Sequence, residues 1–262
     1  DYLAGLFDKQ LAFIRDPSTR KAALCTRRAG KTWCCRAYCF DVAERYPGSM
    51  ILYATITREK ARELMWRPLI DLDREKGLGA SFNATRLTCT LKNGSVIRLA
   101  GLNEERQAEK LLGNKYRLVV IDESASIPDF LRRLIQEVLG PALEDLGGTV
   151  ALIGTPGMLP VGYFHEVTTS VGHCGFSMHQ WSVTDNPYFD QWAGMADWHE
   201  YAVEYIKNLP ARDKISPTDP AYLRQWFAKW VQAESDLMYS ISDTMLHPSP
   251  EFVKVFDDKK TQ

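Results

Sequence analysis

The chain has 262 residues, of which 45% are hydrophobic and 25% charged, a composition typical of a globular domain with a sizeable core and unlike that of disordered or collagen-like chains. Lys and Arg number 32 against 33 Asp and Glu, so a net charge of -1 gives no global electrostatic case for nucleic-acid binding, and any DNA site must be a local patch. No apolar run approaches the roughly 20 residues that span a bilayer, and residues 1–9 lack the features of a secretion signal, so we expect a cytosolic protein without a membrane partner.

The first part of the chain alternates buried strands with helices. Residues 22–26 and 50–54 predict strands, and residues 31–45 predict a helix between them, which together form a βαβ unit. A second helix is expected over residues 57–73 because its apolar residues form one stripe.

A hairpin and further strand–helix units follow. The alternating residues 85–100 flank Asn93-Gly94 and predict a β-hairpin, because this pair readily adopts positive φ at both turn positions. Four more elements are expected: a polar helix over 103–112, a strand over 118–121, a helix over 129–139 and a strand over 149–153. This alternation of strands and helices predicts an α/β fold with a mostly parallel central sheet and helices on both faces.

After Gly154 the sequence becomes irregular and rich in aromatic residues. Helices are expected near residues 192–208 and 220–230, the second with Asp219 as its N-cap and a proline in its first turn. We therefore expect three units: a core over 1–180, a small helical and aromatic-rich subdomain over 181–246 packed on that core, and a linker over 247–262.

The six cysteines include no Cys-x-x-Cys pair and lie in a chain too long for a disulfide scaffold, which indicates reduced thiols. Cys34, Cys35 and Cys39 could hold a soft metal. On a helix without a nearby His, however, they are expected to be small buried apolar residues.

A phosphate-loop pattern lies between the first predicted strand and helix, with the sequence Cys25-Thr26-Arg27-Arg28-Ala29-Gly30-Lys31-Thr32. In that position the backbone N–H groups at the helix start point at nucleotide phosphates. Gly30 would allow close approach, Lys31 would reach the β and γ phosphates of ATP, and the Thr32 hydroxyl would bind Mg²⁺. Cys25 replaces the first glycine of the usual pattern.

Two further motifs follow the phosphate loop in order. Asp122 and Glu123 end the strand over 118–121, so Asp122 would bind Mg²⁺ and Glu123 would orient and deprotonate the attacking water. The alternative is a solvated Asp-Glu pair. Thr155, after the next strand, would sense the γ-phosphate, although Gly-Thr-Pro-Gly alone is simply a turn.

Upstream, Gln10 lies in a short amphipathic stretch about twenty residues before Lys31. An amide can donate to and accept from the edge of adenine at once, so Gln10 is a candidate for binding the base. A surface glutamine on a packing helix is the alternative.

This series resembles the P-loop ATPase domain, of the RecA-like ASCE type, of tailed-phage terminase large subunits. Those proteins open with a glutamine-bearing adenine motif and use a variant phosphate loop that the run from Thr26 to Thr32 fits, so the missing first glycine is expected there. An Asp-Glu pair and a Thr-Pro coupling motif follow. The segments Asp185–Pro187, Asp219–Tyr222 and Trp226–Trp230 resemble the small subdomain and the lead-in to the nuclease.

The resemblance implies ATP-driven packaging of double-stranded viral DNA into a procapsid by a ring of subunits. The implied partners are the portal protein and the small terminase subunit, and the implied location is the host cell cytoplasm. Thr26, Arg27, Arg28 and Ala29 would join the nucleotide site, with the Arg27 guanidinium on the γ-phosphate. As an isolated domain the chain could be a monomer.

Two features depart from the family. Members often carry an arginine, offered to the neighbouring subunit, just ahead of a glycine upstream of Asp-Glu, and here Leu112 stands at that place, leaving Arg106, Lys110 or Arg117 as candidates. Large terminases also continue into a nuclease. Asp257-Asp258 resembles a solvated charge pair more than the start of a two-metal site, so no nuclease activity is expected of this chain.

Two other functions stay open, a helicase or remodelling ATPase with the same core and a non-catalytic nucleotide-dependent switch. A helicase would normally bring a second motor domain. A switch has less need for Glu123 beside the metal-binding Asp122.

Overall fold

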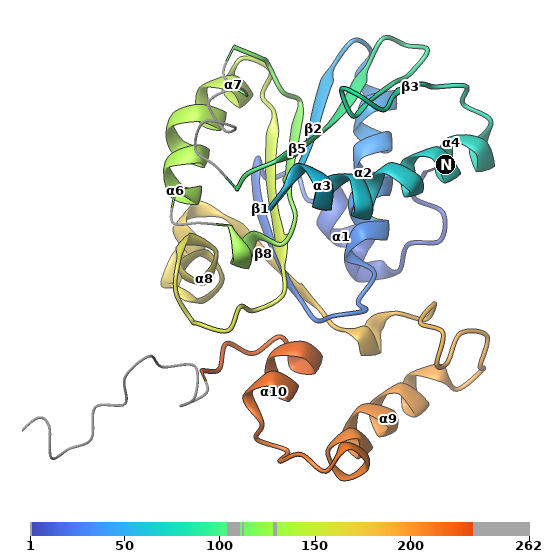
Figure 1. Ribbon diagram of the computed structural model, residues 1–262, viewed down its shortest axis with the longest axis vertical. Helices are drawn as coiled ribbons and strands as arrows, with labels where there is room; N and C mark the ends of the chain where they lie inside the picture. The colour runs from blue at the N-terminus through green and yellow to red at the C-terminus, as the bar shows by residue number, and fades with distance from the viewer. Residues whose placement is uncertain (1, 104–110, 112, 128–129, 233–262) are drawn as a thin grey trace, which may run out of the picture.

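The centre of the molecule is an eight-stranded sheet in a computed structural model that describes residues 2–103, 111, 113–127 and 130–232 (Figure 1). The strands lie in the order β3-β4-β5-β2-β6-β7-β1-β8, and all neighbours from β5 to β8 are parallel. The strands are β1 (Arg20–Cys25), β2 (Met50–Thr55), β3 (Ser81–Asn83), β4 (Thr88–Thr90), β5 (Val96–Gly101), β6 (Leu118–Ile121), β7 (Thr149–Gly154) and β8 (Ser177–Trp181). The predicted α/β class with a mostly parallel sheet is confirmed.

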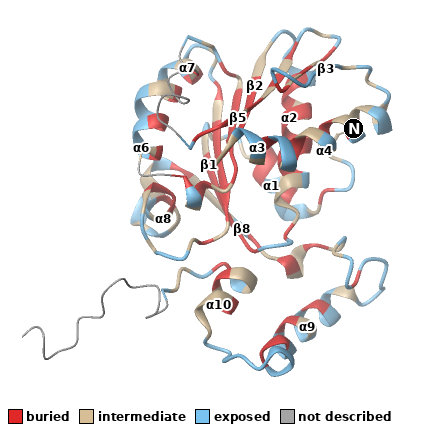
Figure 2. Cartoon of the chain, in the orientation of Figure 1, coloured by how far each residue is buried: buried red, intermediate tan, exposed pale blue. Residues whose placement is uncertain are grey.

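The central strands are buried almost without interruption because helices cover both faces of the sheet (Figure 2). Successive residues of β1 alternate between two cores, since Ala23 and Cys25 join one apolar cluster and Ala22 and Leu24 join the other. One face carries α1 (Asp8–Arg15), α2 (Lys31–Arg45), α3 (Arg58–Ala61) and α4 (Arg67–Lys76), and the opposite face carries α6 (Leu131–Arg133), α7 (Gly140–Glu144) and α8 (Tyr163–Thr169) (Figure 1).

The hairpin between β4 and β5 forms where it was predicted, but its turn is of another type. Only Gly94 has positive φ, at 84°, whereas Asn93 does not. The Gly94 N–H donates to the Leu91 carbonyl at 3.0 Å, and the Leu91 N–H donates to the Ser95 carbonyl at 2.8 Å, which is a three-residue loop ending in a left-handed glycine. The Asn93 amide instead donates to the Ala43 carbonyl at 2.9 Å and ties the turn to the end of α2.

Two helices expected to be continuous contain wide π turns. A π segment, Arg62–Trp66, separates α3 from α4, and a second, Leu134–Leu139, separates α6 from α7. Each lies just before a proline, Pro68 or Pro141. A proline lacks the N–H that would bond four residues back and its ring crowds that carbonyl, so the preceding turn opens.

The part of the chain after β7 is more regular than predicted. Neither α8 nor β8 was expected, and the helix predicted from residue 192 begins six residues later as α9 (Trp198–Asp213). The last described helix, α10 (Pro220–Phe227), has the predicted N-cap, because an Asp219 carboxylate oxygen accepts the Tyr222 N–H at 2.9 Å. No helix of the described residues is long and apolar enough to cross a membrane.

A separate apolar cluster joins α9 and α10 to the segment after β8, with Trp192, Ile206 and Tyr222 among its buried members. The proposed limits of the core, the subdomain and the linker stay predictions, since residues 233–262 lie outside the described part of the chain. The expected polar helix over 103–112 also falls almost wholly outside it.

Candidate functional site

Three loops meet at the carboxyl edge of the neighbouring strands β6, β7 and β1. The phosphate loop joins β1 to α2, the Asp122-Glu123 pair follows β6, and Thr155 follows β7. Because parallel strands end at the same edge, the sheet brings these separate segments of sequence side by side, where open α/β folds bind ligands.

The phosphate loop contains the left-handed turns that make an anion-binding hollow. Arg28 has a φ of 60° and Gly30 a φ of 73°, and Gly30 is the residue from which α2 begins. Glycine suits position 30 because of its positive φ, and a Cβ there would lie 2.8 Å from the Gln10 amide nitrogen, so the Gln10 side chain would have to shift. Such turns at a helix start direct backbone N–H groups at an anion.

Lys31 connects two of the predicted motifs. Its Nζ donates to the Thr26 carbonyl at 3.1 Å and to the Thr155 Oγ1 at 2.9 Å. Both acceptors are neutral, and a phosphate oxygen is a stronger acceptor for an ammonium group. A bound phosphate would therefore compete with Thr155 for Lys31, which gives the loop after β7 a direct contact with the phosphate site.

Asp122 is a buried carboxylate, with 1% of its surface exposed. One oxygen accepts the Glu123 N–H at 2.8 Å, and the other accepts the Tyr53 hydroxyl at 2.7 Å. Burial, followed by the neighbouring Glu123 carboxylate, raises the pKa of Asp122, while Lys31 and the Tyr53 hydrogen bond oppose the shift. A cation would relieve this buried charge, and a carboxylate and a hydroxyl such as that of Thr32 are the hard oxygen ligands that Mg²⁺ prefers.

Glu123 is half-buried and has a left-handed backbone with φ 53° and ψ 39°. This conformation is uncommon for a residue with a side chain, and such strain clusters at functional sites. The turn ends β6 and starts the short helix Ser124–Ser126. The strain therefore falls on the residue predicted to activate water.

Tyr53 is a member of this site that sequence reasoning missed. It lies inside the buried strand β2, and its hydroxyl reaches Asp122 from the adjacent strand. The only available signal was general, because a buried tyrosine hydroxyl needs a hydrogen-bond partner. That rule does not say which residue the partner is.

We predict that Tyr53→Phe lowers the free energy of unfolding by about 1–3 kcal/mol, because the ring still fills the core but one Asp122 oxygen loses its donor. The Mg²⁺ concentration for half-maximal hydrolysis should rise. Chemical denaturation and a Mg²⁺ titration measure the two effects. Tyr116→Phe is the control, since it removes a buried hydroxyl whose partners are the Leu111 carbonyl and the Asn114 and Arg98 side chains rather than Asp122, and an equal Mg²⁺ shift there would contradict the prediction.

Gln10 is not a surface residue, and that alternative is wrong. Only 2% of it is exposed, and its Nε2 donates to the Gly30 carbonyl at 3.0 Å. The structure thus brings Gln10 to the phosphate loop, while its expected contact with adenine stays a prediction.

Thr26 is fully buried, and its hydroxyl accepts the Val183 N–H at 2.7 Å. The side chains of Arg27 and Arg28 are exposed beside it. The Arg27 N–H donates to the Gln225 carbonyl of α10 at 3.0 Å, so the second half of the chain contacts the phosphate loop directly.

A cavity of about 320 Å³ lies next to the phosphate loop, lined by Gly5, Gln10, Gly30, Trp33, Asn186 and Tyr188. Trp33 is 48% exposed and Tyr188 59% exposed, which is unusual for such large apolar rings. Aromatic faces beside amide groups suit a planar base. Neither aromatic residue was predicted, because Trp33 reads as part of α2 and Tyr188 lies in an irregular segment.

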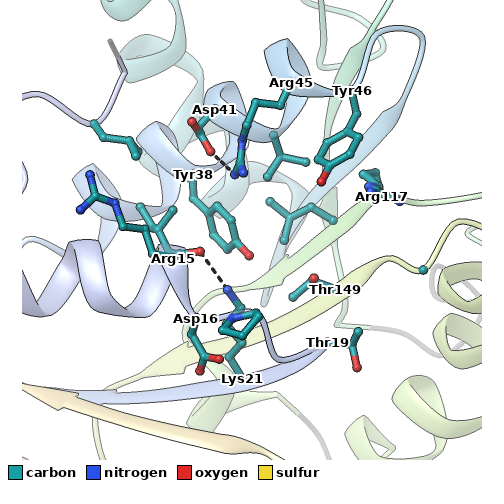
Figure 3. Close-up of a pocket in the computed structure, with 16 residues that line it drawn as sticks. Arg15, Asp16, Thr19, Lys21, Tyr38, Asp41, Arg45, Tyr46, Arg117 and Thr149 are labelled. Atoms are coloured by element: carbon teal, nitrogen blue, oxygen red, sulfur yellow. Dashed lines mark hydrogen bonds and ion pairs between the residues drawn. The ribbon is translucent and has the colours of Figure 1, made fainter.

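A second cavity, of about 460 Å³, lies at the amino edge of the sheet (Figure 3). Arg117 stands there with its guanidinium 3.7 Å from the Tyr46 ring centre. The buried Lys21 donates to the carbonyls of Phe13 and Ile14 at 3.0 Å each and so caps α1, and burial lowers its pKa to about 8. This places Arg117 at the edge opposite the phosphate loop. The other two candidates for a shared cation, Arg106 and Lys110, lie outside the described residues.

The cysteines of α2 are buried as expected. Cys34, Cys35 and Cys39 are at most 1% exposed and carry free thiols, and burial raises the pKa of each. They pack in the core beneath the phosphate loop as small apolar residues.

The comparisons with known proteins agree with this geometry. Residues 23–136 match the family described as terminase large subunit, T4likevirus-type, N-terminal. No curated protein sequence matches the chain.

Solved structures of large terminases share the fold. The Thermus phage P74-26 large terminase ATPase domain has a TM-score of 0.61 at 17% identity, over 86% of this chain and 93% of that one. The large terminase of a thermophilic bacteriophage, also solved with ATP-gamma-S, has a TM-score of 0.65 at 17% identity, over 86% of this chain and 53% of that one. The HK97 bacteriophage large terminase has a TM-score of 0.54 at 13% identity, over 84% of this chain and 49% of that one.

Proposed function

We propose that this chain is a phage terminase large-subunit ATPase domain, because residues 23–136 match that family and the fold matches the Thermus phage ATPase domain. We propose further that it hydrolyses ATP to drive double-stranded viral DNA into a procapsid. The observation that carries the proposal is the contact between Lys31 and Thr155 beside Asp122, which joins the phosphate loop to the loop after β7. A helicase or a non-catalytic switch has no separate observation in its favour.

Each residue of the site has its own role in the proposed reaction. Lys31 and the N–H groups at the start of α2 bind the β and γ phosphates, and the exposed Arg27 guanidinium stabilises charge on the transferred group. Glu123 orients the attacking water and accepts its proton. Mg²⁺, held by Thr32 and Asp122, would neutralise charge on the phosphate oxygens.

Helix α10 is suited to carry the nucleotide state to the rest of the chain. Its Gln225 carbonyl accepts the Arg27 N–H at 3.0 Å, and the neighbouring Arg224 guanidinium approaches the Met158 carbonyl, in the loop after Thr155, at 3.5 Å. Two segments that touch the phosphates thus contact one helix. A change at either would shift α10, as switching proteins move elements that contact the γ-phosphate.

Partners follow from the family and stay proposals, because this chain spans 53% of the large terminase from the thermophilic bacteriophage. We propose a ring of subunits that acts on double-stranded DNA with the portal protein and the small subunit, in the host cell cytoplasm. A residue supplied by a neighbouring subunit can control turnover, so an isolated domain would be slow.

The test is ATP hydrolysis by the purified chain over a series of protein concentrations, with and without linear double-stranded DNA. Turnover per subunit should rise with both, because the ring completes the site. Lys31→Ala serves as the inactive control. A rate per subunit that is independent of concentration and of DNA would contradict a ring motor, and a larger stimulation by single-stranded DNA would favour a helicase.

A further inference from the structure

We infer that Gln10, Trp181 and Asn186 form a clamp that holds the phosphate loop in its anion-binding shape, and that Gln10 positions this loop through its hydrogen bond to Gly30. The inference rests on the proposed function for the identity of the ligand. It assigns a role to Trp181, which neither the motifs nor the resemblance singled out, and to Asn186, which the resemblance placed only in a segment of the small subdomain.

Three consecutive carbonyls of the phosphate loop each accept a hydrogen bond from a different side chain. The Asn186 amide donates to the Arg28 carbonyl at 2.8 Å, the Trp181 indole to the Ala29 carbonyl at 2.8 Å, and the Gln10 amide to the Gly30 carbonyl at 3.0 Å. The donors come from three places in the chain, namely α1, the end of β8 and the segment after it. Three side chains from outside the loop therefore hold its backbone in place.

Because the peptide group is planar, these hydrogen bonds to carbonyls also set the direction of the neighbouring N–H groups. In a trans peptide the C=O of one residue and the N–H of the next point in opposite directions. Fixing the carbonyls of Arg28, Ala29 and Gly30 toward the clamp therefore directs the N–H groups of Ala29, Gly30 and Lys31 away from it. Successive N–H groups held in this way form an anion-binding hollow.

The three donors are themselves held in place. Trp181 is 1% exposed and packs on Phe13 with ring centres 5.6 Å apart. Asn186 is 8% exposed, its side-chain oxygen accepts the Tyr188 N–H at 3.1 Å, and its carbonyl accepts the Trp192 indole at 2.8 Å. Donors that cannot rotate hold the loop without the entropy cost of ordering them at each binding event.

Each end of the Gln10 amide has a partner of its own. Its Nε2 bonds to Gly30, and its Oε1 accepts the Phe7 N–H at 3.4 Å. The close approach to Gly30, where any Cβ would meet the Gln10 amide at 2.8 Å, fits a structural partner of the loop.

A role in the clamp and a role confined to reading the base predict different binding behaviour. A clamp residue affects every ligand that carries the triphosphate, whatever its base. A residue that only reads the base affects ATP more than GTP and leaves inorganic tripolyphosphate unchanged. The dissociation constants of these three ligands for the full chain, measured by calorimetry with Mg²⁺, separate the roles.

For Gln10→Met, Trp181→Phe and Asn186→Ala, we expect each dissociation constant to rise about fivefold to tenfold, the effect of one lost hydrogen bond, with the ratio of ATP to GTP affinity unchanged. Gln136→Met, on an exposed helix position, and Trp230→Phe, whose indole bonds to Thr168, are matched controls that should bind as the wild type does. Thermal unfolding confirms that each variant is folded before it is scored.

Gln10→Glu supplies a rescue test. An ionised carboxylate facing the Gly30 carbonyl repels it, whereas a protonated one donates to it, so affinity relative to the wild type should recover as pH falls. A change confined to the ATP to GTP ratio in Gln10→Met, with tripolyphosphate unaffected, would overturn the inference alone. A wild-type chain that binds none of the three ligands would overturn the proposed function as well.

Discussion

Replacing Glu123 by Gln is expected to slow ATP hydrolysis by about a hundredfold to ten-thousandfold while nucleotide binding persists. The amide keeps the size of the side chain and its place after β6, but it cannot accept a proton from water. Binding depends on Lys31 and on the backbone N–H groups of the phosphate loop, none of which contacts the altered atom in the hydrogen bonds of the site.

Single-turnover hydrolysis and calorimetric binding, on the same preparation, separate the two effects. Glu144→Gln is the matched control, because that glutamate is exposed on α7 at the far side of the fold. Equal turnover in the wild type and Glu123→Gln would remove Glu123 from the reaction. A variant that neither binds nor hydrolyses ATP would instead assign Glu123 a role in shaping the loop, for which its left-handed backbone gives a physical basis.

The sequence predicted the parallel core because its strands are buried on both faces and so appear as continuous apolar runs. The runs at β2 and β6 match the strands to within one residue, and the helix over 31–45 is correct at both ends. Strand β8 was missed for the converse reason. It lies at the edge of the sheet beside β1, with a half-exposed polar sequence that carries no strand period.

Some residues of the candidate site could likewise be predicted from the sequence, and others could not. The residues proposed to bind phosphate lie in one contiguous motif, and local sequence is sufficient to identify that motif. Tyr53, Trp181 and Asn186 reach the site across the sheet or from the segment after β8, and only the fold brings them there. The prediction of positive φ at Asn93 failed because its side chain prefers the end of α2, a tertiary contact that turn statistics do not contain.

The buried Asp122 carboxylate is expected to serve hydrolysis while it lowers the stability of the nucleotide-free fold. Asp122→Asn should abolish Mg²⁺-dependent hydrolysis, because the buried carboxylate is the proposed ligand, and should at the same time raise the midpoint of thermal unfolding of the nucleotide-free chain by a few degrees. The neutral amide no longer carries a buried charge beside Glu123. It can also accept the Glu123 N–H and donate to the Tyr53 oxygen, so both contacts are kept, the second with its direction reversed.

The stabilisation expected from Asp122→Asn should depend on pH, because only the wild-type carboxyl ionises. The folded-state pKa of Asp122 is raised, mainly by burial and then by Glu123, above its ordinary value of 3.8. Below the unfolded value both states are protonated and the carboxyl carries no penalty. As pH rises from the unfolded toward the folded pKa, the unfolded chain loses this proton while the folded chain keeps it, and wild-type stability falls until the buried carboxyl has ionised. The stability difference between Asp122→Asn and the wild type should therefore be smallest at acid pH and grow toward neutral pH, as measured by chemical denaturation at each pH.

A difference that shrinks as pH rises would mean that a cationic neighbour, with Lys31 the nearest candidate, already compensates the charge. In that case the ion would not be needed to stabilise the buried carboxylate, and the fit of this site to Mg²⁺ would rest on the ligand chemistry of Thr32 and Asp122 alone.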